Sequence, residues 1–363
     1  MTTRTLTFRE ALNEAIRLEM RRDPTVILIG EDVAGGAGLP HLEAAGGSEW
    51  GGALGVTVGL AKEFGRKRVL DTPISESAIM GAAVGAAITG LRPIAELMFV
   101  DFFGVCMDQI YNQGGKFRYM FGGKVQVPVV IRATIGAGLR AAAQHSGCHY
   151  SVFTHMPGLK TVVPSTPYDA KGLLISAIRD PDPIIFFEHK LLYGISGEVP
   201  EGDYTIPLGM ADIKRKGKDV TVVAIGRMVH FALEAADKLS KDGMDLEVID
   251  LRTLSPLDNK TILQSVKKTH RLVVIDEDNP RCSMACDIIA LVCTKAFDDL
   301  DAPPGMVTAP HTPVPFSPPL EDYYIPSVDK IISTVKSMIS QHYSENSFVT
   351  PTPTLPPQGG GKV

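Results

Sequence analysis

The sequence predicts an α/β protein built from two doubly wound domains, each a mostly parallel sheet covered by helices on both faces. Short runs rich in Val, Ile and Leu alternate with segments of helical periodicity along both halves of the chain. These runs are apolar throughout, which is typical of parallel strands buried on both faces. The length of 363 residues also favours two domains over one.

The first half of the chain shows this alternation from its start. A capping box at Thr7–Glu10 predicts a helix that begins at Phe8 and stops at Asp23-Pro24. We place the first domain at residues 1–188. Its expected strands are 26–29, 68–71, 93–99, 127–131, 161–163 and 184–187, and its expected helices are 53–64, one beginning at Glu76, 101–118 and 168–179.

The second half repeats the alternation after a break. Residues 189–219 lack a clear period and contain a Lys/Arg run, which predicts an inter-domain linker. A second α/β domain follows at 220–341. The last residues, 342–363, are polar and rich in Pro and Gly, and we expect a disordered tail there. The expected strands of this domain are 220–225, 246–251, 272–275 and one near Val307, and its helices are near 228–241, 258–269, 283–298 and 327–340.

Composition excludes several functional classes. The net charge of −5 and the lack of a basic block argue against a nucleic-acid-binding protein. No apolar run reaches the ~18 residues that a membrane span needs, and the N-terminus lacks the apolar core of a signal peptide. The five cysteines are odd in number and form no Cys-x-x-Cys pair, so we expect reduced thiols and a cytoplasmic protein.

The stretch Arg68–Glu96 places one acid at a distinctive position. It reads as strand, turn, small-residue helix and strand, with Ser75 as the expected N-cap and Glu76 in the first helical turn. Gly81 and Gly85 leave one helix face almost without side chains, so another backbone can approach it. Taken locally, Glu76 is either a carboxylate that complements the helix dipole or a functional acid.

Other motifs favour structural roles. The segment Gly136–Ala141 mimics a dinucleotide fingerprint but lacks the acid expected about 20 residues later. His145, Cys148, His149 and His155 match no zinc spacing, so packing is favoured over a metal. His145 differs from the others because its imidazole, in a Gly-flanked segment, can exchange a proton near neutral pH.

Two further segments invite a ligand and also favour the plainer interpretation. Residues 35–55 are rich in glycine but carry no Lys or Arg, which favours a surface or interface loop over a phosphate site. Near Asp180 and Asp182 two prolines end a helix, and a monovalent cation could occupy that end. Spacing alone favours a simple helix stop.

The chain has no P-loop and no Gly-x-Ser-x-Gly elbow.

Several stretches match one protein family together and in the same order. They are Asp71–Glu76, Asp108–Ile110, Ala143–Ser146, Pro157–Lys160, Ser176–Asp180 and Leu251–Thr253. Over residues 4–340 the chain therefore resembles the β subunit of the thiamine-diphosphate-dependent first component of 2-oxo acid dehydrogenase complexes.

Five more stretches point to one branch of that family. They are Glu49–Gly52, Phe99–Cys106, Gly136–Ala141, Glu188–Tyr193 and Asn279–Met284. In them the chain is most similar to the acetoin dehydrogenase branch, whereas the pyruvate and branched-chain relatives differ.

The resemblance implies a transketolase-like pyrimidine-binding domain followed by a transketolase C-terminal domain. It also implies an α₂β₂ heterotetramer with thiamine diphosphate at the α–β interface, docked to a lipoyl-bearing acyltransferase core. The family's diphosphate motif, Gly-Asp-Gly with a later Asn, is absent here, because Gly202-Asp203 is followed by Tyr204. Magnesium is therefore expected on the α subunit.

The resemblance also implies residue roles. Glu76 would hydrogen-bond the aminopyrimidine ring and favour its imino tautomer, with Phe102 and Gln109 lining the pyrimidine pocket. His145 would stabilise the adduct or protonate the lipoyl sulfur. A structural potassium site maps onto Val129, Ala177, Ile178, Asp180 and Asp182, although relatives often have Asn at the Asp182 position.

The expected reaction is cleavage of acetoin to acetaldehyde with transfer of the acetyl group to lipoamide. Two alternatives stay open at this stage. The substrate could instead be pyruvate or a branched-chain 2-oxo acid. The chain could also be a non-catalytic assembly subunit that mainly docks the lipoyl-bearing core.

Overall fold

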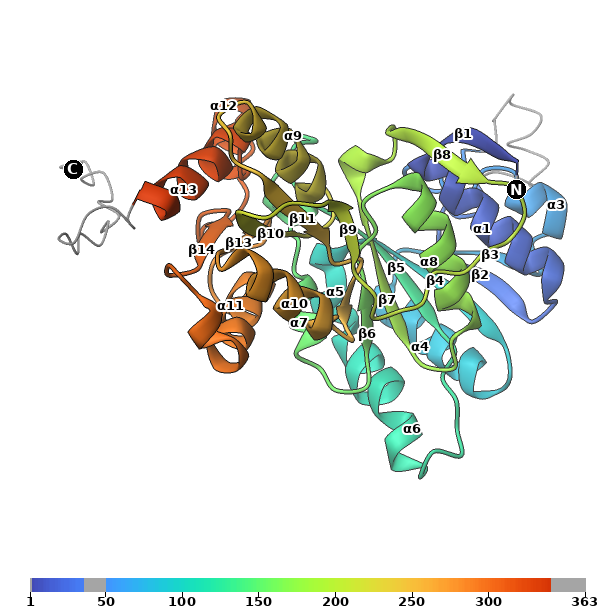
Figure 1. Cartoon of the computed structure of the whole chain (residues 1–363). Coiled ribbons are helices and arrows are strands. Elements are labelled where there is room, and N and C mark those ends of the chain that lie inside the picture. The colour runs from blue at the N-terminus through green and yellow to red at the C-terminus, as the bar shows by residue number, and fades with distance from the viewer. Residues whose placement is uncertain (1, 36–49, 341–363) are drawn as a thin grey trace, which may run out of the picture.

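The computed structural model describes residues 2–35 and 50–340. The tail expected at 342–363 and most of the glycine-rich segment 35–55 lie outside the described residues. Within the described ranges, no helix combines the length and the apolar character that crossing a bilayer requires. Two α/β domains lie against each other, the first blue to green and the second yellow to red in Figure 1.

The sheet of the first domain has seven strands in the order β12-β6-β7-β5-β4-β2-β3. Its strands are parallel except β12. Successive apolar residues point to opposite faces, as Ile184 and Ile185 show by entering two different core clusters. The strands are β2 (Val26–Glu31), β3 (Val69–Thr72), β4 (Arg92–Phe99), β5 (Val130–Ile135), β6 (Lys160–Val162), β7 (Ile184–His189) and β12 (Thr253–Ser255).

Helices cover both faces of this sheet. α1 and α8 lie side by side on one face (Figure 1), and α4 packs its Ile79 and Met80 on the other. The predicted capping box starts α1, because Glu10 N–H donates to the Thr7 hydroxyl and Thr7 N–H donates to the Glu10 carboxylate. The helices are α1 (Phe8–Arg22), α3 (Leu60–Phe64), α4 (Glu76–Ile88), α5 (Phe103–Met107), α6 (Lys116–Met120), α7 (Tyr150–Thr154) and α8 (Pro167–Arg179), with the 3-10 turns η1 (Val100–Phe102), η3 (Ala143–His145) and η4 (Lys190–Leu192) and the π-helix η2 (Asp108–Gly115).

The second domain is a five-stranded sheet in the order β14-β13-β10-β11-β9, with only β9 antiparallel. α9 and α13 cover its outer face, while α10 and α11 share an apolar cluster with the first domain. The elements are β9 (Asp212–Arg215), β10 (Val220–Ala224), α9 (Met228–Ser240), β11 (Leu246–Asp250), α10 (Asn259–Thr269), β13 (Leu272–Asp276), α11 (Met284–Lys295), η5 (Phe297–Asp299), β14 (Gly305–Thr308), α12 (Pro318–Tyr324) and α13 (Val328–Ser340).

The α/β class predicted from the sequence is confirmed, but the segment expected as a linker contains strands. Within 189–219, β8 (Ser196–Pro200) pairs with β1 (Thr3–Thr7), and β9 joins the second sheet. β12 also crosses back from the second domain to pair with β6. These strands are short and lie at sheet edges, and β1, β8 and β9 are largely polar, so they lack the apolar runs that mark the central strands.

Three local expectations differ from the structure. The helix expected at 53–64 is shortened to α3, and the one expected at 101–118 is divided into η1, α5, η2 and α6. Ser75 does not cap α4, because its hydroxyl donates to the Pro73 carbonyl oxygen at 3.2 Å. α4 therefore begins at Glu76 without a side-chain cap from its own N-cap residue.

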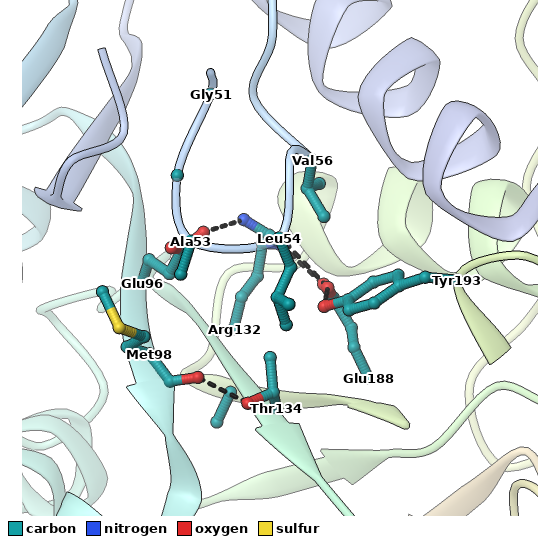
Figure 2. A pocket seen from close by; sticks show the side chains of 12 residues that line it. Gly51, Ala53, Leu54, Val56, Glu96, Met98, Arg132, Thr134, Glu188 and Tyr193 are labelled. Carbon is teal, nitrogen blue, oxygen red and sulfur yellow. Dashed lines mark hydrogen bonds and ion pairs between the residues drawn. The ribbon is translucent and has the colours of Figure 1, made fainter. Parts of the chain in front are cut away.

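A buried ionic cluster lies at the centre of the first sheet. Arg132 is 2% exposed and donates to both carboxylate oxygens of Glu188, at 2.6 and 2.7 Å, and to Glu96 at 2.8 Å. The Tyr193 hydroxyl donates to Glu188 as well. Burial raises the pKa of Glu96, which Arg132 partly offsets. Figure 2 shows these side chains converging beneath the loop that carries Gly51.

The cavity around this cluster is small. Its volume is about 10 Å³, room for roughly one water molecule and far too little for a cofactor. The cluster is therefore part of the core of the domain.

Replacing Arg132 with Leu should strongly destabilise the chain, because two carboxylates would stay buried without their partner. We expect a loss of about 3–5 kcal/mol in the free energy of unfolding, measured by urea denaturation. Tyr193→Phe removes one hydrogen bond and should cost only about 1 kcal/mol. Equal losses in the two variants would contradict the assigned role of Arg132.

Candidate active site

Glu76 opens α4 directly after the turn that follows β3. Its side chain is half-buried, and among the described residues its carboxylate has no hydrogen-bond partner. The charge of Glu76 affects neighbouring groups. Burial and the charges of Asp32 and Glu76 raise the pKa of Glu31. Burial and Glu76 together raise the pKa of the Cys106 thiol to about 12. Glu76 is thus an unengaged acceptor at a helix start, available to a ligand.

Gln109 reaches α4 from the π-helix η2. A Cβ atom on Gly81 would lie 3.2 Å from Gln109 Oε1, so glycine at this position admits the amide beside the helix. The Ser77 hydroxyl donates to the Val105 carbonyl oxygen and ties α5 to α4. Gly85 has no atom within 4 Å of the position a Cβ would take, so this part of the face is open.

His145 and Phe102 lie in direct contact. The imidazole of His145 packs nearly perpendicular to two phenyl rings, with centroid distances of 4.7 Å to Phe99 and 5.5 Å to Phe102. Phe102 lies directly before α5, and η2 follows α5 with Gln109, which lies beside Gly81 of α4. The segment 99–109 thus joins the two predicted catalytic regions, with His145 at its start and the helix of Glu76 at its end.

The loop that carries His145 is anchored at several points. Gly136 N–H donates to the Gly147 carbonyl oxygen at 3.0 Å, and Gly147 N–H donates to Asp101 at 3.1 Å. Arg140 pairs with Glu321 of α12. A Cβ on Gly136 would lie 2.0 Å from His189 Nε2, so the fingerprint-like glycines serve close packing here.

The same loop contains a strained residue. Ala142 has φ 62° and ψ −174°, a backbone region that is almost exclusive to glycine. Such a conformation costs about 1–3 kcal/mol and persists only where surrounding contacts determine it. The loop therefore depends on its anchors to hold this shape.

The second domain contributes acidic groups beneath this loop. Asp276 is fully buried, which raises its pKa to about 7, and it accepts a hydrogen bond from the Tyr150 hydroxyl. Glu277 accepts from Ala137 N–H at 2.8 Å and lies 2.9 Å from His189. The Asp101 carboxylate of the first domain, 3.6 Å from His149 Nε2, raises the pKa of His149. Across the described residues, no group of three or more His, Cys, Asp or Glu is arranged to hold a metal ion.

The five residues expected around potassium lie at the end of α8, where their oxygens already have protein partners. Arg92 donates to the carbonyl oxygens of Ile178 and Asp180 at 2.8 and 3.2 Å. Lys160 Nζ lies 2.7 Å from the Asp180 carboxylate and 3.1 Å from that of Asp182. The Val129 carbonyl oxygen accepts a hydrogen bond from Ile184 N–H, and the Ala177 carbonyl oxygen accepts one from Asp180 N–H. Arg118 forms an ion pair with the Asp182 carboxylate. A potassium ion would therefore compete with Arg92, Lys160 and Arg118 for these oxygens.

Exchanging potassium for sodium or choline should leave the melting temperature of the chain unchanged. An ion bound to the folded chain and present at a hundred times its Kd would add about 2.7 kcal/mol to the free energy of unfolding, which is enough to raise the melting temperature measurably. Lys160→Met is the matched variant, because it frees the Asp180 carboxylate, and its melting temperature should rise with potassium. A potassium-dependent wild-type melting temperature would show that the ion displaces these internal cations.

Comparison with known proteins places this geometry in a family. Residues 4–196 match the domain family "Transketolase, pyrimidine binding domain", and residues 209–331 match the domain family "Transketolase, C-terminal domain". The acetoin:2,6-dichlorophenolindophenol oxidoreductase subunit beta of Bacillus subtilis is 62% identical over 93% of this chain and 98% of its own length. The subunit of the same name from Cupriavidus necator is also 62% identical, over 92% and 97%.

The chain belongs to the family of dehydrogenase β subunits with transketolase-type domains. Other members are more distant: the pyruvate dehydrogenase E1 component subunit beta of Rhizobium meliloti is 45% identical over 92% of this chain and 70% of its own length. The 2-oxoisovalerate dehydrogenase subunit beta of Bacillus subtilis is 42% identical over 92% and 98%. A solved split-gene transketolase, described as an inactive beta4 tetramer, shares the fold with a TM-score of 0.74 at 22% identity, covering 92% of this chain and 99% of its own.

Proposed function

We propose that this chain is the β subunit of a thiamine-diphosphate-dependent acetoin dehydrogenase. In this proposal it cleaves acetoin to acetaldehyde and transfers the acetyl group to lipoamide. The observation that supports it best is the identity of 62% to two acetoin oxidoreductase β subunits, against 45% and 42% to the pyruvate and 2-oxoisovalerate relatives. The five free cysteines are in keeping with a reducing, cytoplasmic location.

The residues around α4 fit an aminopyrimidine ring. Glu76 offers an unengaged carboxylate, Gln109 an amide and Phe102 an aromatic edge. Thiamine diphosphate, when bound, supplies a nucleophilic thiazolium carbon. Glu76 would hold the proton at the ring nitrogen, and Gln109 with Phe102 would orient the ring. His145 would stabilise the adduct or give a proton to the lipoyl sulfur.

A partner subunit would complete this site. The chain lacks the Gly-Asp-Gly and Asn motif, so we assign magnesium and the diphosphate to an α subunit in an α₂β₂ heterotetramer. Beside Glu76, the apolar side chains of Ile74 and Val105 are 74% and 64% exposed. Exposed apolar side chains near the start of α4 are of the kind that subunit interfaces bury. We further propose that the heterotetramer docks to a lipoyl-bearing acyltransferase core.

The substrate is tested by combining the chain with its α partner and measuring dye reduction with acetoin and with pyruvate. The proposal expects turnover with acetoin and little with pyruvate or branched-chain 2-oxo acids. A preference for pyruvate or a branched-chain 2-oxo acid over acetoin would instead assign the chain to the 2-oxo acid branch of its family.

Glu76→Gln should lower acetoin turnover by at least ~100-fold, because the variant cannot exchange a proton at the ring nitrogen. Glu10→Gln is the matched control, since Glu10 also lies in the first turn of a helix but serves only its capping box. That control should lose stability and keep its turnover. Near-normal acetoin turnover in Glu76→Gln would favour a non-catalytic assembly subunit.

His145→Ala should reduce acetylation of lipoamide more than reduction of an artificial dye. The dye accepts electrons without needing a proton on sulfur, so it bypasses the step assigned to the imidazole. Rates with both acceptors are measured on the same preparation. Equal residual rates would argue against an acceptor-specific role for His145.

A further inference from the structure

One buried ammonium group lies directly behind the catalytic loop. Lys190 begins η4 at the end of β7, is 5% exposed, and donates from Nζ to the backbone carbonyl oxygen of His145 at 2.6 Å. Lysine is almost never buried this deeply unless it is paired. No carboxylate of the described residues forms an ion pair with Lys190, so its closest polar partner is a backbone group of the active-site loop.

The same ammonium group also reaches the imidazole through a ring. Lys190 Nζ lies over the face of Phe99, 5.5 Å from the ring centroid, and the edge-on contact of Phe99 with His145 is 4.7 Å. Lys190 thus acts on both the main chain and the side chain of His145. Both contacts bear on a loop whose Ala142 adopts an unfavourable backbone conformation, so each anchor affects where the imidazole lies.

The surroundings of Lys190 are also where the acetoin-like stretches meet. Three of the five stretches form or contact the loop that carries His145, residues 136–147. Phe99–Cys106 supplies two rings and Asp101, Gly136–Ala141 supplies the bond to Gly147, and Glu188–Tyr193 supplies Lys190. Three of the stretches in which the chain resembles the acetoin branch therefore lie around one histidine.

We infer that Lys190 is a positioning residue for His145, and that it is needed for acetyl transfer to the lipoyl group more than for cleavage of acetoin. The selective effect on acetyl transfer rests on the proposed function, in which His145 serves the lipoyl step. The positioning role rests only on the contacts of Lys190 with the His145 carbonyl oxygen and with Phe99.

The chain contains a matched control. Lys171 is fully buried, donates to the Pro200 carbonyl oxygen at 2.7 Å, and has its Nζ 5.2 Å from the ring centroid of Tyr204. It thus makes the same two kinds of contact as Lys190, in α8 and away from the His145 loop, and in addition an ion pair with Glu14 at 3.1 Å. Its removal reports the cost of losing a buried ammonium group together with that ion pair.

The experiment uses the complex of this chain with its α partner. Lys190→Met should lower kcat for lipoamide acetylation ~10- to 100-fold, because misplacing a reacting group by about 1 Å costs on this scale. Dye reduction and the KM for acetoin should change far less. Lys171→Met should lower the melting temperature and change both acceptor rates alike.

A double-mutant cycle separates positioning from general support of the fold. If Lys190 acts through His145, adding Lys190→Met to His145→Ala should change the lipoamide rate by less than ~2-fold. The same loss in both backgrounds would overturn the inference. If Lys190→Met fails to assemble, Lys190→Gln, which keeps a donor for the carbonyl oxygen, enters the cycle in its place.

The outcomes also separate this inference from the proposed function. If His145→Ala slows both acceptors equally, the lipoyl step assigned to His145 fails, and the acceptor-specific clause about Lys190 fails with it. The cycle would still decide whether Lys190 positions His145, because its coupling does not depend on which step is slowed.

Discussion

An apolar cluster shared by both domains is the constraint on which the candidate active site depends. Ile131 and Phe187 of the first sheet and Val223 and Val274 of the second belong to one continuous cluster. This packing brings Glu277 and Glu321 of the second domain within reach of the loop before His145. Because both domains hold that loop, its geometry depends on how they pack together.

The two catalytic candidates are supported in different ways. His145 is surrounded by phenyl rings, a buried ammonium group and a strained backbone, all supplied by this chain. Glu76 instead has an unengaged carboxylate beside exposed Ile74 and Val105. One residue is preorganised by its own chain, and the other lies where a second subunit would complete the surroundings. This contrast is what a site shared between two chains requires.

Much of the fold could be predicted from local pattern. The central strands and the helices that cover them are strongly apolar or periodic, and the capping box at Thr7 was correct to the residue. The edge strands β1, β8 and β9 were missed, because half-exposed strands carry no apolar run. The π-helix was also missed, since its shift of one residue per turn leaves hardly any mark in the sequence.

The candidate site residues came from the resemblance and remain predictions. The resemblance identified Glu76, Phe102, Gln109 and His145 as candidates, and the structure connects them through the segment 99–109. It did not identify Lys190, because a buried lysine is visible only once its burial is known. The potassium set was likewise implied by the resemblance. Sequence could not show that Arg92, from a strand far away in the chain, takes two of its carbonyl oxygens.

In the proposed function, this chain holds only half of a thiamine diphosphate site. Titrating thiamine diphosphate with magnesium in a calorimeter, into the chain alone and into its mixture with the α partner, tests this proposal. We expect no measurable binding to the chain alone and stoichiometric binding to the mixture. Stoichiometric binding to the isolated chain, with an affinity like that of the mixture, would contradict it.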